Sequence, residues 1–159
     1  MAVNQSKLEF KPQPGPQTLF FESTADIVFY GGAAGGGKSF ALTLEATRHF
    51  NNPLVDCVIF RRTTPQITNP GALYDQASEI FIPMGASPSD LKFTFPSGMT
   101  VKLAHMEHEK NKFDWQGSAI AYMGWDEITH FTRSQFFYML SRNRSMSGVR
   151  PYIRGTCNP

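Results

Sequence analysis

The sequence has 159 residues and a formal net charge of +2, a length that fits one compact domain with a single hydrophobic core. Hydrophobic residues make up 41% of the chain and charged residues 18%, which indicates a globular rather than a disordered protein, and the longest apolar runs are too short to cross a bilayer. The nearly even charge balance neither requires nor excludes a nucleic-acid partner.

The N-terminal part of the chain is predicted to be extended. Three prolines in Phe10–Gln17 are incompatible with a regular helix, so residues 1–24 are expected to form an extended lead-in. The short apolar run Ala25–Tyr30 then ends at Gly31. This pattern predicts a buried strand that enters a tight turn.

A glycine-rich segment follows this strand. Gly32-Ala-Ala-Gly-Gly-Gly-Lys-Ser39 fits the P-loop (Walker A) pattern G-x-x-x-x-G-K-[S/T]. Glycines allow positive φ angles, so the backbone N–H groups can turn inward and form a nest for phosphate oxygens. The alternative is a flexible surface loop, but a position between a strand and a helix favours the P-loop. The predicted ATP-binding residues are Gly32, Gly35, Gly36, Gly37, Lys38, which reaches the β- and γ-phosphates, and Ser39, which binds Mg²⁺.

The middle of the chain alternates between helical and strand-like patterns. Apolar residues recur at helical spacing after the P-loop, and a second buried-strand pattern and a hairpin around a Pro-Ser-Gly turn come next. The predicted elements are a helix over Lys38–Phe50, a strand over Leu54–Arg61, and paired strands over Leu91–Phe95 and Met99–Leu103.

A pair of carboxylates follows a third apolar run. Ala119–Trp125 leads directly into Asp126 and Glu127, the arrangement of a Walker B element. A buried parallel strand delivers its carboxyl end to the edge of the sheet where ligands bind. Asp126 is therefore expected to hold the Mg²⁺ shell, and Glu127 to orient and deprotonate the water that attacks the γ-phosphate. Taken alone, a solvated acidic pair at a strand end would be the simpler interpretation.

The last part of the chain completes an alternating pattern. Thr132 and Gln135 form a capping box, which predicts the start of a helix. Tyr152–Thr156 is predicted to be a final short strand. Strands that alternate with helices predict an α/β fold with a mainly parallel sheet.

These motifs together resemble the ATPase domain of the large terminase subunit, the molecular motor that packages DNA into tailed bacteriophages and related viruses. The resemblance implies a P-loop NTPase fold of the ASCE (RecA-like) type, with helices on both sides of the sheet. The resemblance runs from about Phe10 to Pro159 and implies one terminase-type ATPase domain over 1–159. It also implies that the rest of that domain and a nuclease domain lie outside these residues, so no nuclease site is expected here. The matching stretches are PQPGPQTLFFES, DIVFYGGAAGGGKSFAL, FRRT, DWQGSAIAYMGWDEITHFTRSQFFYMLSRNRS and GTCNP.

The resemblance also assigns roles to residues outside the two central motifs. Gln17 resembles the adenine-recognising glutamine, and Thr156 and Asn158 resemble the coupling motif that detects the γ-phosphate. An arginine finger that stabilises the transition state is expected as well, from this chain or from a neighbouring subunit. The candidates are Arg61, Arg62, Arg142 and Arg144, of which Arg142 is the first choice.

The implied function is ATP hydrolysis that drives double-stranded viral DNA into an empty capsid. The implied partners are DNA, the portal protein, the small terminase subunit and further copies in a ring on the capsid, with no membrane. Two cysteines and no signal peptide agree with the host cytoplasm, with transient residence on the procapsid. The alternatives are a cellular helicase-like DNA-dependent ATPase and a non-hydrolysing nucleotide-binding assembly module. Lys110 with Lys112 and Arg150 with Arg154 form two small basic spots, but neither is a stripe, so the contact with DNA is implied by the resemblance more than by these residues.

Overall fold

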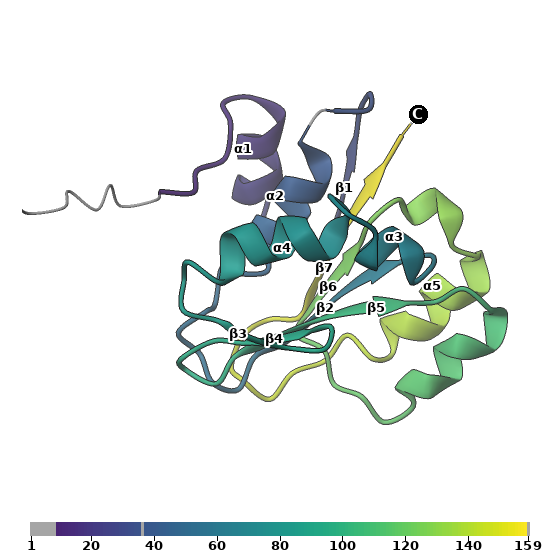
Figure 1. The fold of residues 1–159 in the computed structure, drawn as a ribbon. Helices are drawn as coiled ribbons and strands as arrows, with labels where there is room; N and C mark the ends of the chain where they lie inside the picture. Colours follow the sequence, from purple (N-terminus) through teal and green to yellow (C-terminus); the bar gives the residue numbers. More distant parts are fainter. Residues whose placement is uncertain (1–8, 36, 159) are drawn as a thin grey trace, which may run out of the picture.

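A seven-stranded sheet forms the centre of the molecule in the computed structural model, which describes residues 9–35 and 37–158 (Figure 1). The strand order is β1-β7-β6-β2-β5-β4-β3. The first five strands in this order are mutually parallel, and β4 and β3 continue the sheet in antiparallel pairing. The strands are β1 (Ile27–Gly31), β2 (Asp56–Arg61), β3 (Ser87–Ser89), β4 (Lys92–Thr94), β5 (Thr100–His105), β6 (Tyr122–Trp125) and β7 (Tyr152–Cys157).

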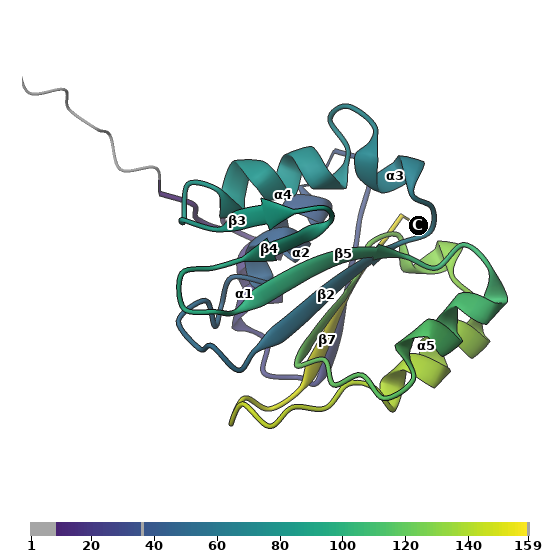
Figure 2. The same cartoon turned by 60° about the horizontal axis from the view of Figure 1, so that its bottom comes forward.

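Helices cover both faces of the sheet (Figures 1 and 2). One face packs against α1, α2 and α4 through a large apolar cluster, and the other packs against α5 and the 3₁₀ helix η1 through a second cluster. The predicted fold class, α/β with a mainly parallel sheet between helices, is therefore confirmed. The helices are α1 (Pro16–Glu22), α2 (Lys38–Glu45), α3 (Pro65–Thr68), α4 (Leu73–Phe81), η1 (Glu109–Trp115), η2 (Ile128–His130) and α5 (Arg133–Leu140).

Two local sequence signals form the structures that they predict. The Thr132 hydroxyl accepts a hydrogen bond from the Gln135 backbone N–H at 3.1 Å, and the Gln135 side chain accepts one from the Thr132 N–H at 3.0 Å. This reciprocal capping box starts α5. The hairpin of β4 and β5 turns at Gly98, whose φ of +102° is open to glycine and strained for other residues.

The predicted extended lead-in is wrong over Pro16–Glu22, because these residues form α1. Pro16 occupies the first helical position, where a backbone N–H would have no intrahelical acceptor and its absence costs little. The prediction for residues 1–8 lies outside the described part of the chain. The predicted helix after the P-loop is also shorter than expected: it ends at Glu45 and continues as turns to residue 51.

The prediction that the first strand is buried is also wrong. Within the described ranges β1 pairs only with β7, so it lies at the edge of the sheet. Ile27 and Phe29 on β1 are 41% and 51% exposed. The second predicted strand is correct, since Cys57–Phe60 in β2 is fully buried in the middle of the sheet. Across residues 9–35 and 37–158, no helix has both the length and the apolar character needed to span a bilayer.

Candidate active site

The P-loop connects the end of β1 to the start of α2, at the carboxyl edge of the parallel strands. Gly35 and Gly37 have φ angles of +83° and +66°, the left-handed conformation that the glycine pattern predicts. The Lys38 amine donates hydrogen bonds to the carbonyls of Gly32 at 2.7 Å and Ala33 at 2.6 Å. The Lys38 side chain thus folds back across the P-loop, and its amine contacts the first two residues of the loop. Gly36 lies outside the described residues.

The acidic pair stands beside the P-loop. All four residues of β6 are buried, and the strand ends at Trp125, directly before Asp126, which is 2% exposed. The Ser39 hydroxyl lies 3.0 and 3.2 Å from the two carboxylate oxygens of Asp126. Two segments 87 residues apart in the sequence therefore meet through a direct side-chain hydrogen bond.

The end of β7 adds two polar side chains to the same cluster. The Thr156 hydroxyl donates to Asp126 Oδ1 at 2.7 Å and accepts from the backbone N–H of Glu127 at 3.1 Å. The Asn158 amide donates to both carboxylate oxygens of Glu127, at 3.0 and 3.1 Å. The residues assigned to the coupling motif thus contact both members of the acidic pair. The roles of these residues in detecting phosphate remain predictions.

Glu127 has a strained backbone. Its φ and ψ are +57° and +59°, a left-handed conformation that costs a non-glycine residue about 1–3 kcal/mol. The hydrogen bonds from its own N–H to Thr156 and from Asn158 to its carboxylate hold it in this conformation. A strained backbone conformation persists only where the surrounding contacts hold it in place. Such conformations are concentrated at functional sites.

Arg61, and not Arg142, is the arginine that contacts the acidic pair in this chain. Arg61 is the last residue of β2, and its guanidinium lies 2.7 Å from Asp126 Oδ2 and 3.8 Å from Glu127 Oε1. The Arg142 carbonyl instead accepts a hydrogen bond from Ile120, which precedes β6. Arg142 therefore lies near the amino ends of the parallel strands, opposite to the end that carries Asp126. The extended chain from Ile120 to Asp126 spans about 20 Å. A finger role for Arg142 is left only toward a neighbouring subunit, where it stays a prediction.

The other two arginine candidates, Arg62 and Arg144, form hydrogen bonds that connect segments of the fold. Arg62 donates to the Met106 carbonyl at 3.0 Å and to the Gln135 side chain at 2.8 Å, which ties the end of β2 to the start of α5. Arg144 donates to the carbonyls of Gly117 and Ser118, on the loop that leads into β6.

A surface ion pair supports the segment that follows the acidic pair. Glu109 on η1 accepts hydrogen bonds from the Lys112 amine and from the Thr132 hydroxyl, both at 2.7 Å. The Lys112 hydrogen bond, followed by those of the Thr132 and Ser134 hydroxyls, lowers the pKa of Glu109 to about 2. Glu109 therefore stays ionised at neutral pH and fastens η1 to the beginning of α5.

Gln17 lies against the P-loop. Its side-chain amide donates to the Gly37 carbonyl at 3.1 Å and accepts from the Gln13 backbone N–H at 2.8 Å, and only 2% of the residue is exposed. A Cβ atom at Gly37 would lie 2.4 Å from the Gln17 amide nitrogen, so a glycine is required there for this contact. The structure brings Gln17 to the P-loop, and its recognition of adenine remains a prediction.

The sequence of the chain matches a known family over residues 29–159. The family is described as terminase large subunit, T4-like-virus type, N-terminal. The chain belongs to this family. No curated protein sequence matches this terminase chain.

Solved structures of phage packaging proteins share the fold of this terminase chain. The large terminase of a thermophilic bacteriophage matches with a TM-score of 0.65 and 18% identity, over 91% of this chain and 38% of that one. The large terminase ATPase domain of a Thermus phage matches with a TM-score of 0.60 and 14% identity, over 94% and 66%. The N-terminal domain of the bacteriophage phi29 DNA packaging ATPase matches with a TM-score of 0.57 and 15% identity, over 82% and 72%. The chain thus spans 38% of the first of these proteins, and at these identities the likeness shows the fold.

The ion pair between Arg61 and Asp126 is expected to stabilise this terminase fold. Asp126 is 3% exposed and Arg61 is 21% exposed at the side chain, so Arg61→Gln leaves a buried carboxylate without its cation. We expect the free energy of unfolding to fall by about 2 kcal/mol, measured by urea denaturation. Arg150→Gln is the matched control, because Arg150 pairs with Asp26 at 2.8 Å with side-chain exposures of 78% and 53%. The control is expected to cost about 0.5 kcal/mol or less. Equal losses in the two variants would contradict the importance of burial at the site.

Proposed function

We propose that this chain binds ATP together with Mg²⁺ and hydrolyses it, and that this hydrolysis drives the packaging of double-stranded viral DNA into an empty capsid. The observation that supports the proposal most directly is the contact between the Ser39 hydroxyl and the Asp126 carboxylate. It joins the Walker A and Walker B elements in the arrangement that phosphoryl transfer requires. A large terminase structure with the same fold has been solved in complex with ADP, and another with ATP-γ-S.

The residues at this junction fit a magnesium-bound nucleotide. Mg²⁺ prefers hard oxygen ligands and usually takes only one or two from the protein, and Ser39 and Asp126 offer a hydroxyl and a carboxylate. Bound there, the ion would neutralise charge on the β- and γ-phosphates. The P-loop backbone and the Lys38 amine would hold the phosphates.

Glu127 is the proposed general base. Its carboxylate would accept a proton from the attacking water and direct that water at the γ-phosphorus. Asn158, which donates to both oxygens of this carboxylate, would set its orientation, and the Thr156 hydroxyl links the Glu127 backbone N–H to Asp126. Arg61, 3.8 Å from Glu127, would balance the negative charge of the pair.

The proposed partners follow from the family. We propose double-stranded DNA, the portal protein and the small terminase subunit as partners, and a homo-oligomeric ring on the procapsid in the host cytoplasm as the working assembly. A likeness to a chain in the bacteriophage phi29 genome packaging motor assembly supports this proposal through the fold, with a TM-score of 0.57 at 13% identity.

ATP hydrolysis by the purified protein is expected to increase severalfold when duplex DNA is added. ATP hydrolysis in the absence of DNA moves nothing, so we expect a DNA-packaging motor to hydrolyse ATP faster when DNA is bound. The measurement is steady-state phosphate release with and without duplex DNA, and then with purified portal and empty capsids and protection of the packaged DNA from nuclease. Turnover that ignores DNA would point to an ATPase of another kind, and nucleotide binding without turnover would favour an assembly module.

A further inference from the structure

The hairpin of β4 and β5 places two lysines side by side. Lys92 lies directly opposite Lys102 in the antiparallel pair, and both side chains are exposed. Neither lysine forms an ion pair with any residue in the described ranges 9–35 and 37–158. Like charges directly opposite each other on neighbouring strands destabilise a sheet. An anion that binds against both lysines would remove this repulsion.

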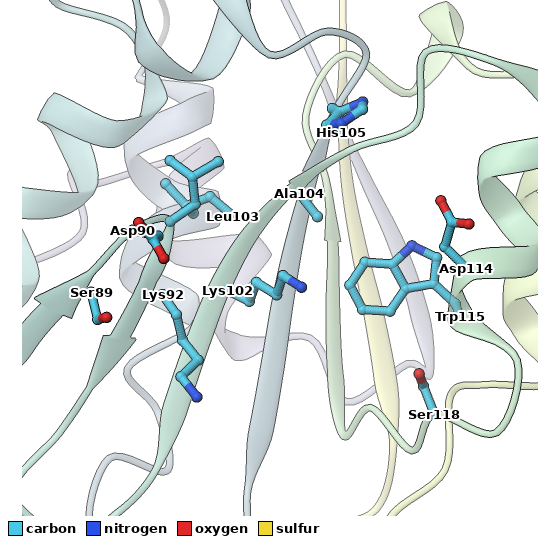
Figure 3. Close-up of a pocket in the computed structure, with 11 residues that line it drawn as sticks. Ser89, Asp90, Lys92, Lys102, Leu103, Ala104, His105, Asp114, Trp115 and Ser118 are labelled. Carbon is cyan, nitrogen blue, oxygen red and sulfur yellow. The ribbon is translucent and has the colours of Figure 1, made fainter.

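The two lysines line an open depression of about 670 Å³ between the hairpin and η1, which we call the lysine trough (Figure 3). Trp115 forms the opposite wall, and the Lys102 amine lies 5.2 Å from the centre of its ring. The ring itself packs edge-to-face on the buried Phe60, at 5.1 Å between centroids. Ser118 adds a hydroxyl on the same side. The lysine trough thus has two adjacent cations on one side and a rigid aromatic ring on the other.

Two carboxylates also line the lysine trough, on opposite sides of it. Asp90 lies in the turn between β3 and β4, and Asp114 lies on η1 next to Trp115 (Figure 3). Asp114 accepts a hydrogen bond from the Asn111 amide at 3.3 Å. These acids limit the affinity of the lysine pair for a polyanion. A moderate affinity suits a contact that must release its ligand at each step of movement.

Three of the four side chains in the basic spots identified from the sequence are engaged within the fold, in contrast to the lysine pair. Lys112 bonds to Glu109 at 2.7 Å, and Arg150 pairs with Asp26 at 2.8 Å. Arg154 is 3% exposed, and its guanidinium donates hydrogen bonds to the backbone carbonyls of Ala25 and Ser23. These three side chains are therefore poorly suited to hold an external anion.

We propose that the lysine trough binds the phosphate backbone of duplex DNA, an inference that rests on the proposed packaging function. Each DNA strand carries one charge per about 3.4 Å of helix axis, so two neighbouring amines on flexible stems can contact nearby phosphates. Lysine contacts to phosphate do not depend on the base sequence. A motor that moves along any DNA sequence requires contacts of this kind. The chemistry of the trough matches this ligand, because it offers two adjacent cations that no carboxylate of the described residues neutralises in an ion pair.

β5 connects the lysine trough to the active site. His105, at the end of β5, lines the trough and is the register partner of Arg61 on β2. Arg61 in turn binds Asp126. A ligand that shifts the end of β5 can therefore act on the acidic pair through one neighbouring strand, which gives DNA a short physical route to the residues of hydrolysis.

The test is the salt dependence of DNA binding, measured by fluorescence anisotropy with a short labelled duplex. For the double variant Lys92→Ala/Lys102→Ala, the slope of log affinity against log salt is expected to fall by about one for each lysine. Lys92→Arg/Lys102→Arg should keep the slope, because it keeps both cations. The ATPase rate without DNA should stay unchanged in both variants, while its stimulation by DNA should fall in the alanine variant.

Lys11→Ala/Arg150→Ala serves as the matched control, because it removes the same charge from exposed ion pairs outside the trough. The lysine trough is overturned as the DNA site if the alanine variant of the trough keeps the wild-type slope, or if the control loses as much. Both results leave the packaging function standing. If the wild-type protein binds no duplex at any salt concentration, the trough and the proposed DNA translocation fail together.

Discussion

Glu127→Gln is expected to lower the kcat of ATP hydrolysis by about 10²–10⁴-fold while the affinity for ATP stays within a few-fold of wild type. Glutamine keeps the size of the side chain and can still accept a hydrogen bond from the Asn158 amide, which contacts the Glu127 carboxylate at 3.0 Å. It cannot take a proton from water. The backbone conformation, fixed by the bond from the residue's N–H to Thr156, is also retained. The variant therefore removes the proposed base and little else.

The measurements are single-turnover hydrolysis and equilibrium binding of ATP to the same preparation. Glu107→Gln is a suitable control, because Glu107 is an exposed glutamate on the loop after β5 and lies outside the acidic pair. A wild-type rate in Glu127→Gln would remove this residue as the base. If binding were lost together with turnover, Glu127 would instead be needed to shape the site.

The meeting of the two motifs could be predicted from the sequence because parallel strands impose it. Apolar runs identify the strand that leads into the P-loop and the strand that leads into Asp126, and the carboxyl ends of parallel strands share one edge of the sheet. The hydrogen bond between Ser39 and Asp126 follows from that rule. The position of β1 in the sheet could not be predicted, because a short apolar run is compatible with a central strand and with an edge strand.

The arginine near the acidic pair could have been identified by the same rule. Arg61 is the last residue of a parallel strand, so it belongs to the ligand-binding edge, whereas Arg142 follows a helix that leads the chain back to the opposite edge. The pairing of Lys92 with Lys102 was beyond sequence analysis. It depends on the exact hairpin register, and a slip by one residue would turn one lysine to the other face.

Lys38→Ala is expected to abolish both ATP binding and turnover. The Lys38 amine is the one side-chain cation that the described part of the P-loop contributes, and its residue is 7% exposed. Its hydrogen bonds to the carbonyls of Gly32 and Ala33 place it where the loop would enclose phosphate. Charge-assisted hydrogen bonds of this kind contribute about 1.5–3 kcal/mol each, so the loss of two or more raises the Kd for ATP by at least about 100-fold.

Isothermal titration with ATP measures the loss of binding in Lys38→Ala, and a urea denaturation curve shows whether the variant remains folded. Lys110→Ala, which removes an exposed lysine from η1, should bind ATP as the wild type does. The comparison with Glu127→Gln separates the two motifs: one variant should bind ATP without hydrolysing it, and the other should do neither. A Lys38→Ala variant that binds ATP with wild-type affinity would mean that backbone amides alone hold the phosphates. The lysine would then act in the transition state, because its removal could lower only the rate.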